Sequence, residues 1–356
     1  MESVGIITLC GNDNYGNKLQ NYALKKTIEK LGFNVGTIWI DYASNSNIIK
    51  KIVKIMINKV NCNNKKNYLI KVKKCKLFSE QYLNNDYSIR ISNNLRKIDN
   101  KYDYFVVGSD QVWNYRYISD FDLYFMKKIQ KNKVFSYSAS FGVSDIPIKY
   151  YDKYNDGLNH LKNISVRENR GLELVQKISN RKDSIVSIDP TMLLNDYEWN
   201  DLLKDVHLIT PKKFILTYFL GNLSDDKKNE INKLCKKYDC DLINIMDIND
   251  NFYSSSPEEF LYLLKNSLLV CTDSFHACVF SIIFDKTFIY FERDYAGANM
   301  NSRIETLLSK FDISDRIYNG KKITEKNIKH DYSKAYNLLK QEQNKSIDYL
   351  KKSLDI

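Results

Sequence analysis

A histidine at the start of an apolar segment is the strongest candidate for proton transfer in this chain. His276 lies in the stretch TDSFHACVFS, two residues after the triplet Thr272, Asp273 and Ser274. The exposed N–H groups and the dipole at the start of a helix favour an anion, and an imidazole can act as an acid or a base near neutral pH. The alternative interpretation is structural, with Asp273 or Ser274 as a helix cap and His276 as a packing residue.

Three arginines are candidates for binding a carboxylate or a phosphate. Arg167 follows the β-like residues 164–166, Arg293 follows the run TFIYFE, and Arg303 lies in the triplet Asn-Ser-Arg. The planar guanidinium group can form two parallel hydrogen bonds to either anion. For each arginine, a surface ion pair is the alternative.

Polar loops that follow apolar strands supply candidate contacts for a sugar. The stretch VVGSDQVWN passes from a buried strand into a run of hydrogen-bonding side chains, and GNDNYGN follows the first strand. Small residues in such loops allow close backbone approach, while Ser and Asp can cap a helix or bind a ligand. The tryptophan could stack on a sugar or pack between domains. The expected acceptor or cleft residues are Asn14, Asn17, Ser109, Asp110, Gln111, Trp113 and Asn114.

An alternating series of strands and helices must position these loops. Strands are expected over 4–9, 35–40, 104–107, 133–138, 163–166 and 185–188, and then over 214–219, 242–245, 268–272 and 287–291. The helices between them include 19–31, 225–238, 257–264, 275–284 and 301–311, with a charged helical tail from 332. Ser224 and Ser256 are expected to cap the helices that follow them. This alternation predicts an α/β protein with two parallel sheets facing a cleft, into which the carboxyl ends of the strands point.

The composition is that of a two-domain globular protein. The chain has 356 residues, 43% of them hydrophobic, and only 4 prolines and 12 glycines, so we expect a short, packed domain boundary. The seven cysteines include no C-x-x-C pair, which argues against a disulfide framework or a zinc site and favours a reducing cytosol. The N-terminal stretch MESVGIITLC is expected to be a strand rather than a secretion signal.

The positive charge is concentrated in one segment. The net charge is +11, and residues 43–79 contain ten lysines and no acid. A solvated helical face, together with a bias of the genome toward lysine, is one interpretation of this charge. A basic amphipathic helix over 48–76, with Ile and Val between the lysines, is a hypothesis for peripheral contact with an anionic membrane. No known nucleic-acid-binding motif surrounds the segment, so no nucleic-acid partner is expected.

Several stretches, taken in order, resemble one known family. They are GNDNYGNKLQNYAL, YDYFVVGSDQVWN, YSASFG, SVRENRGLELV, SIDPTMLL, PEEFLYLLKNSLLVCTDSFHACVFSIIFDKTFIYF and NSRIETLL. The chain resembles the polysaccharide pyruvyl transferases over roughly residues 5 to 308. GSDQVWN and TDSFHACVFSIIF in this order are the most specific parts.

The resemblance implies a fold and an activity. The fold would be two Rossmann-like domains in a GT-B-like arrangement around a central cleft, with a C-terminal helical tail. We expect an N-terminal domain over 1–188 on the acceptor side with a basic helical insert at 43–83, a donor-side domain over 189–325, and a tail over 326–356. The enzyme would transfer the enolpyruvyl group of phosphoenolpyruvate onto two hydroxyls of a cell-surface glycan or its lipid-linked precursor, without a cofactor or a metal. It would act in the cytoplasm, with peripheral contact at the inner face of the membrane.

The resemblance also implies roles for site residues. His276 matches the family's catalytic histidine. The better-known members have an arginine two residues before it, where this chain has Ser274. One of Arg167, Arg293 and Arg303 would then replace that arginine in binding the donor, next to Ser274.

A glycosyltransferase of similar architecture that uses a nucleotide sugar is the alternative function. Two facing sheets suit it equally well. The sequence contains no G-x-x-x-x-G-K-[ST] motif and no G-x-G-x-x-G motif after the first strand, so nucleotide hydrolysis and ordinary dinucleotide chemistry lose support.

Overall fold

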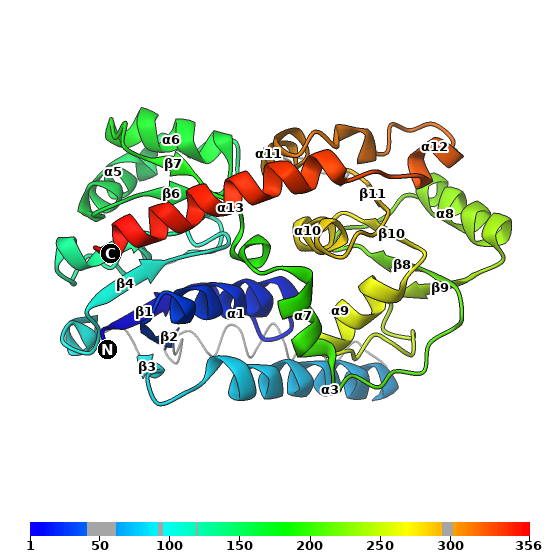
Figure 1. Ribbon diagram of the computed structural model, residues 1–356, viewed down its shortest axis with the longest axis horizontal. Helices are drawn as coiled ribbons and strands as arrows, with labels where there is room; N and C mark the ends of the chain where they lie inside the picture. Colours follow the sequence, from blue (N-terminus) through cyan, green and yellow to red (C-terminus); the bar gives the residue numbers. More distant parts are fainter. Residues whose placement is uncertain (41–61, 92–94, 119, 294–301) are drawn as a thin grey trace.

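Two parallel sheets stand side by side, and one long helix runs across both of them (Figure 1). The computed structural model describes the whole chain except residues 41–61, 92–94, 119 and 294–301. Part of the expected basic helix over 48–76 therefore lies outside the described residues. This part contains the lysines at 50, 51, 54 and 59 and the isoleucines and valines among them.

The first sheet is built from the N-terminal part of the chain in the order β3-β2-β1-β4-β5. Its strands are β1 (Ser3–Ile7), β2 (Asn34–Ile40), β3 (Ile89–Ile91), β4 (Tyr104–Val107) and β5 (Val134–Ser136). All neighbouring strands are parallel. The short pair β6 (Ser165–Val166) and β7 (Ile185–Val186) continues this layer through single bridges to 135 and 139. Strands that are buried on both faces of a sheet are typically formed by continuous runs of apolar residues.

The second sheet has the order β11-β10-β8-β9 and is also parallel. Its strands are β8 (Phe214–Tyr218), β9 (Asp241–Asn244), β10 (Leu269–Thr272) and β11 (Phe288–Tyr290). The expected α/β class with two parallel sheets is therefore confirmed. The domain boundaries at 188 and 325 stay predictions.

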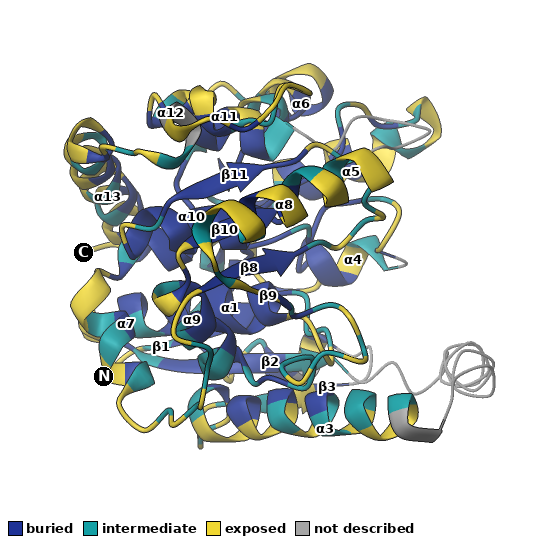
Figure 2. Cartoon of the chain, turned by 90° about the vertical axis from the view of Figure 1, so that its right-hand side faces the viewer, coloured by how far each residue is buried: buried dark blue, intermediate teal, exposed yellow. Residues whose placement is uncertain are grey.

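Helices cover both faces of the sheets (Figure 2). They are α1 (Tyr15–Lys30), α3 (Cys62–Phe78), α4 (Phe121–Tyr124), α5 (Tyr151–His160), α6 (Asn169–Ser179), α7 (Asp196–Leu203), α8 (Asp225–Tyr238), α9 (Pro257–Asn266), α10 (Phe275–Ile283), α11 (Ser302–Lys310), α12 (Glu325–Ile328) and α13 (Ser333–Ser353). A π-helical turn (Ser79–Leu83) continues α3, and short 3-10 turns cover Leu95–Ile98, Lys131–Lys133, Ile148–Tyr150, Pro190–Leu193 and Ser314–Arg316. In the described part of the chain, no helix is both long and apolar enough to cross a membrane.

The starts of some helices follow local sequence rules. Ser256 caps α9 in a capping box with Glu259, and Pro257 occupies the first turn, as expected. Asn14 caps α1 by accepting a hydrogen bond from the Asn17 N–H. Ser224 precedes α8 as expected, but its side chain makes no capping hydrogen bond.

A shared core holds the two sheets together. Tyr15 and Leu19 of α1 belong to the same buried cluster as Phe260 of α9 and Phe280 of α10. The rings of Tyr15 and Phe260 stack with centroids 4.8 Å apart. All residues of α10 are buried, and this helix lies in the middle of the molecule (Figure 2). The second half of the chain, which forms the second sheet, is therefore packed through α1 against the first half, which forms the first sheet. The strand ends of both halves face one cleft.

Candidate functional site

The carboxyl ends of five strands meet at one cleft of about 430 Å³. Side chains from both halves line it: Leu9, Asn14, Gly16, Asn17, Asp110, Gln111, Tyr117, Tyr218, Leu220, Ser274, Phe275, His276, Arg293 and Arg303. They follow β1, β4, β8, β10 and β11, except for Arg303, which lies in the first turn of α11. Ligands of open parallel sheets bind at such strand ends.

His276 lies in the first turn of α10 with one edge of its ring against α1. The Nδ1 atom is so close to Gly16 that a Cβ added there would lie 2.2 Å from it. The Nε2 atom is buried, has no hydrogen-bond partner among the described residues, and lies 3.7 Å from Asp189 Oδ2. The imidazole therefore lies at the cleft wall with a carboxylate behind it.

Asp189 and Arg167 form a buried ion pair behind His276. The Arg167 Nη2 atom lies 3.0 Å from Asp189 Oδ2, and Thr191 donates hydrogen bonds to Asp189 Oδ1 from its N–H and its hydroxyl. Burial alone would raise the pKa of Asp189. Attraction to Arg167 and to His276, together with the hydrogen bonds from Thr191, outweighs that cost and holds the pKa well below its usual range. Asp189 is therefore a fixed negative charge beside the imidazole.

Arg167 does not line the cleft, contrary to the expectation that it binds a donor directly. Its side chain is 1% exposed. Its guanidinium donates to Ser109 Oγ at 2.6 Å and also faces Asp110 Oδ1 at 3.5 Å. Two carboxylates, Asp110 and Asp189, thus neutralise this arginine inside the protein, so Arg167 is placed to hold the polar network together.

Asp110 connects that network to the first helix. Its Oδ2 atom accepts a hydrogen bond from the Asn17 side chain, and both residues line the cleft. The backbone of Asp110 adopts a left-handed conformation with φ of 69°, which Asp tolerates better than most residues. Gly108, with φ of 120°, must stay a glycine because a Cβ there would lie 2.3 Å from the Tyr137 carbonyl oxygen.

The start of α10 is left without a side-chain cap. Ser274 occupies the cap position but makes no capping hydrogen bond. Asp273 instead accepts hydrogen bonds from the N–H groups of Leu220 and Gly221, at 2.7 and 2.8 Å, and pairs with Arg293 Nε at 2.7 Å. Neither residue caps the helix, so its first N–H groups stay available to an anion.

Arg303 differs from the other arginines of the cleft. The structure gives it no ion pair with a described residue, and its Nε atom is buried without a hydrogen-bond partner among them. Its guanidinium carbon lies 5.9 Å from the centroid of the Phe275 ring, while that of Arg167 lies 4.9 Å from the same ring. Burial, followed by repulsion from Arg167, lowers the pKa of Arg303, although an arginine remains charged in proteins.

Glu168 is a buried carboxylate close to these cations. Its Oε1 atom accepts hydrogen bonds from Ser140 Oγ and from the N–H groups of Phe141 and Gly142, and its Oε2 atom has no partner among the described residues. Burial raises its pKa, and attraction to Arg303 and Arg167 opposes the rise. The YSASFG loop is thus tied to the residue after Arg167.

Part of the expected acceptor set does not reach the cleft. Asn14, Asn17, Asp110 and Gln111 line it, but Ser109, Trp113 and Asn114 are fully buried and do not. Trp113 stacks on Phe125 with ring centroids 5.2 Å apart and donates from Nε1 to the Tyr124 carbonyl. It packs in the core of the first half, because the chain turns inward after Gln111, so neither a sugar nor the other domain can contact its ring.

Sequence reasoning missed Asp189, Glu168 and Gly16 as parts of the site. Asp189 lies before Pro190 at the expected junction of the two halves and within the stretch SIDPTMLL, and both are signals that could have suggested a role. Glu168 follows Arg167 directly. Nothing in the sequence indicated that Gly16 would lie against an imidazole 260 positions away.

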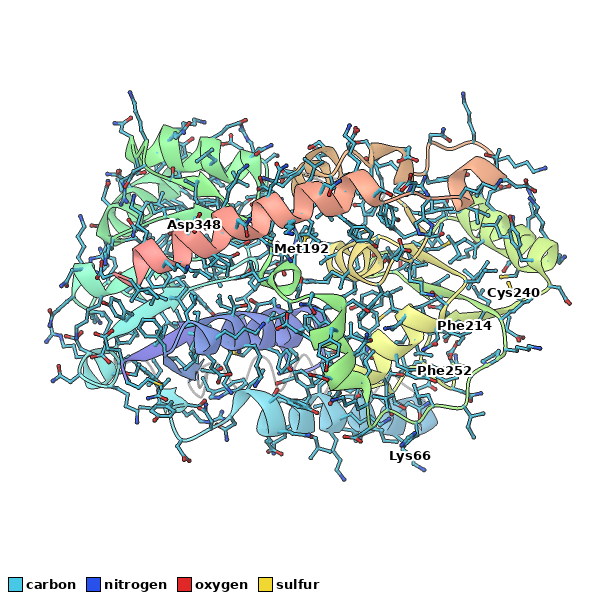
Figure 3. The ribbon with its side chains drawn as sticks, in the orientation of Figure 1. Lys66, Met192, Phe214, Cys240, Phe252 and Asp348 are labelled. Carbon is cyan, nitrogen blue, oxygen red and sulfur yellow. The ribbon has the colours of Figure 1, made fainter. Side chains whose placement is uncertain are left out.

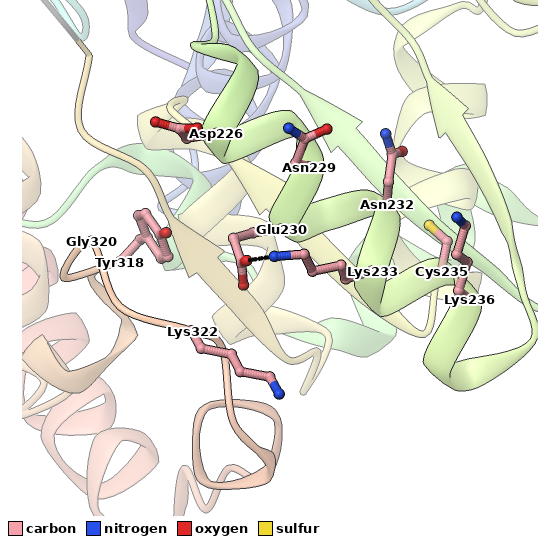
Figure 4. Close-up of a pocket in the computed structure, with 10 residues that line it drawn as sticks. All are labelled: Asp226, Asn229, Glu230, Asn232, Lys233, Cys235, Lys236, Tyr318, Gly320 and Lys322. Carbon is pink, nitrogen blue, oxygen red and sulfur yellow. Dashed lines mark hydrogen bonds and ion pairs between the residues drawn. The ribbon is translucent and has the colours of Figure 1, made fainter.

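A larger hollow of about 750 Å³ lies on the surface beside α8 (Figure 4). Its lining mixes acids and lysines, and Glu230 and Lys233 pair across 2.6 Å. None of the residues considered above lines it. Among the described residues, no group of three or more His, Cys, Asp or Glu side chains could hold a metal ion. The cleft at His276 is therefore the candidate active site.

Comparison with known proteins agrees with this architecture. A proposed UDP-N-acetylglucosamine 2-epimerase from Listeria monocytogenes superposes with a TM-score of 0.53 at 10% identity, over 97% of this chain and 90% of that one. A UDP-N-acetylglucosamine 2-epimerase from Rickettsia bellii gives a TM-score of 0.49 at 12% identity, over 99% and 98% of the chains. At such identities the first likeness shows the fold alone, a GT-B-like pair of Rossmann-like domains around a cleft with a C-terminal helix.

A search of curated proteins finds no match. The family model described as polysaccharide pyruvyl transferase matches residues 14–295, which include His276, Asp189 and most of the cleft. The match covers well over half of the chain. The chain therefore belongs to the polysaccharide pyruvyl transferase family and is a transferase.

Proposed function

We propose that the enzyme transfers the enolpyruvyl group of phosphoenolpyruvate onto two hydroxyls of a sugar in a cell-surface polysaccharide or its lipid-linked precursor. The products are a cyclic ketal and inorganic phosphate. The observation that carries the proposal is the position of His276 in the first turn of an uncapped helix, in a cleft that also presents Arg303. A proton donor and two kinds of anion-binding group are then within one cavity.

The reaction needs a group that moves protons. Carbon C3 of the donor gains one proton, which gives C2 oxocarbenium character. The two sugar oxygens form bonds to C2, the bond between C2 and the phosphate oxygen breaks, and the two hydroxyl protons end on C3 and on phosphate. His276 donates the proton to C3 and recovers one from a hydroxyl. Asp189, 3.7 Å from Nε2, stabilises the imidazolium form.

The donor carries a carboxylate and a phosphate, so it requires uncompensated positive charge. Arg167 is neutralised by Asp110 and Asp189, and Arg293 is paired with Asp273. Arg303 has no such carboxylate partner among the described residues, and we assign it the role of the arginine that is missing at Ser274. The first N–H groups of α10 bind the second anionic group.

The acceptor sugar binds on the wall formed by the first half. Asn14, Asn17 and Gln111 present amides there, and Asp110 presents a carboxylate. Amides both donate and accept hydrogen bonds, which suits hydroxyl groups. The sugar would then lie between α1 and α10, on the side of the cleft where Gly16 leaves room for the imidazole.

The direct test measures phosphate release from phosphoenolpyruvate with candidate glycans. The variant His276→Ala should lose about 100- to 10,000-fold in rate, as expected for a catalytic acid or base, while phosphoenolpyruvate still raises its melting temperature. Undiminished release would reject the role of His276. Protection by nucleotide sugars alone, with none by phosphoenolpyruvate, would instead support glycosyl transfer.

A second variant tests the geometry rather than the chemistry of the imidazole. Gly16→Ala adds a methyl group 2.2 Å from Nδ1, so the ring must move, and a shift of about 1 Å can cost about 100-fold in rate. The control Gly157→Ala meets the Phe125 ring at 2.4 Å, away from the cleft. It should lower stability but leave the activity of the folded enzyme intact.

A further inference from the structure

The outer face of α3 is basic and carries exposed leucines. Leu69 and Leu77 are 50% and 51% exposed, although leucine is usually buried. Lys65, Lys66, Lys73 and Lys76 are exposed on the same helix. Residues 65, 69, 73 and 77 are four apart, residue 66 lies three before 69, and residue 76 lies three after 73, so these six residues form one continuous stripe along the helix.

The opposite face of α3 is firmly packed. Lys71, Cys75 and Phe78 are buried, and the Asn67 amide donates to the Ile248 carbonyl. Lys74 pairs with Glu259 at 2.6 Å. The helix is therefore held against α1 and α9, and its rotation is fixed with the stripe directed outward. Figure 3 shows Lys66 at this outer edge of the molecule.

The charge of the stripe is hardly compensated. Lys76 lies 3.4 Å from Glu80, whereas Lys65, Lys66 and Lys73 form no ion pair with any described residue, and the sequence has no acid between 43 and 79. Three exposed lysines of α8 differ. On α8, Lys228, Lys233 and Lys237 each lie within 3.2 Å of a carboxylate oxygen.

We propose that this face of α3 docks on an anionic lipid surface. The lysines bind the headgroups, and Leu69 and Leu77 enter the boundary between headgroups and acyl chains. The exposed non-polar groups of the stripe are leucines rather than the aromatic rings that stack on nucleic-acid bases, which favours a lipid partner. Charge complementarity and exposed apolar side chains thus select the same partner.

Docking would also fix the height of the cleft above the membrane. Phe78 of α3 packs edge-on against Tyr22 of α1 with ring centroids 6.1 Å apart. The first turn of α1 carries Asn17 and Gly16 at the cleft wall. The helix that meets the lipid is therefore packed on the helix that forms the cleft, while the proposed surface itself is separate from the cleft.

Sedimentation of the full chain with vesicles tests the inference. At low salt the protein should sediment with vesicles of phosphatidylglycerol and phosphatidylcholine but not with phosphatidylcholine alone. The triple variant Lys65→Gln, Lys66→Gln, Lys73→Gln should bind about 100-fold more weakly, since each lysine near an anionic surface contributes about a factor of five. The double variant Leu69→Ser, Leu77→Ser should bind more weakly at every salt concentration.

The matched control removes the same charge from another helix. Lys228→Gln, Lys233→Gln, Lys237→Gln on α8 should keep vesicle binding within about threefold of the original protein. Equal losses in both triple variants would overturn the inference, as would no binding to anionic vesicles at low salt. Tighter binding to single-stranded RNA than to these vesicles, lost in the α3 variant, would identify a nucleic-acid surface instead.

Discussion

Asp189 links His276 at the cleft wall to Arg167, which is buried behind it. Its Oδ2 atom lies 3.0 Å from Arg167 Nη2 and 3.7 Å from His276 Nε2. A buried carboxylate in this position is stable only while it is paired. Folding lowers the pKa of Asp189. The ionised carboxylate therefore stabilises the folded protein at pH values above its unfolded pKa of about 3.9. That contribution is lost as the pH falls toward the folded value.

The variant Asp189→Asn should therefore lower the free energy of unfolding at pH 7 by about 3 kcal/mol, because it leaves Arg167 buried with one carboxylate fewer. Urea unfolding at several pH values between 7 and 3 measures the effect. The difference in the free energy of unfolding between the original protein and the variant should become smaller as the pH falls below about 5.

The exposed Asp348 on α13 supplies the control, since Asp348→Asn should change stability by less than about 0.5 kcal/mol. A gap at Asp189 that stays constant or widens in acid would contradict the assignment of a paired, ionised carboxylate.

At the scale of elements, two serines at helix starts have opposite roles. Ser256 closes a capping box on α9, with its hydroxyl 3.2 Å from the Glu259 nitrogen. Ser274 occupies the same position on α10 without capping it. The surroundings of the two helix starts differ. The start of α10 faces the cleft, and the neighbouring Asp273 is bonded to the loop at 220–221 and to Arg293 and does not cap the helix either.

The substitutions Ser256→Ala and Ser274→Ala should separate these roles. Loss of the α9 cap should cost about 1 kcal/mol, whereas the change at α10 should cost less than about 0.5 kcal/mol. Chemical denaturation of both variants measures the comparison. An equal loss at both sites would mean that the Ser274 hydroxyl caps α10 in solution.

Element prediction succeeded where local signals were strong. The limits of β4 and α8 are those expected, and α9 begins with the expected cap. The helix α7 was missed, although Asn195 and Glu198 form a capping box that the sequence displays. The strand β3 is only three residues long and pairs at the edge of the sheet, so no periodicity could reveal it.

At the scale of the whole molecule, α13 connects the two halves (Figure 1). Its start packs in the second half, where Tyr332 and Ala335 belong to the shared core. Its end packs on the first sheet, where Tyr349 donates to the Ser136 carbonyl at 2.7 Å and Leu350 is fully buried. The helix therefore stabilises the relative position of the halves, and with it the cleft.

Removing one anchor should loosen the first half. Leu350→Ala should lower the free energy of unfolding by about 3 kcal/mol, with faster amide hydrogen exchange in β1, β4 and β5 as well as in α13. Exchange that quickens in α13 alone would contradict a structural link to the sheet. Asp348→Ala, exposed two residues earlier, serves as the control.

The sequence by itself determined the α/β class, the tandem sheets and the family, and it singled out His276 as a candidate, because these rest on local periodicity, on caps and on short ordered motifs. Only the tertiary structure decided which candidates meet. It buried Trp113 and Arg167, opened the start of α10, and brought Asp189 and Gly16 to the imidazole. Such contacts join residues far apart along the chain, and they depend on how two sheets pack, which no local pattern encodes.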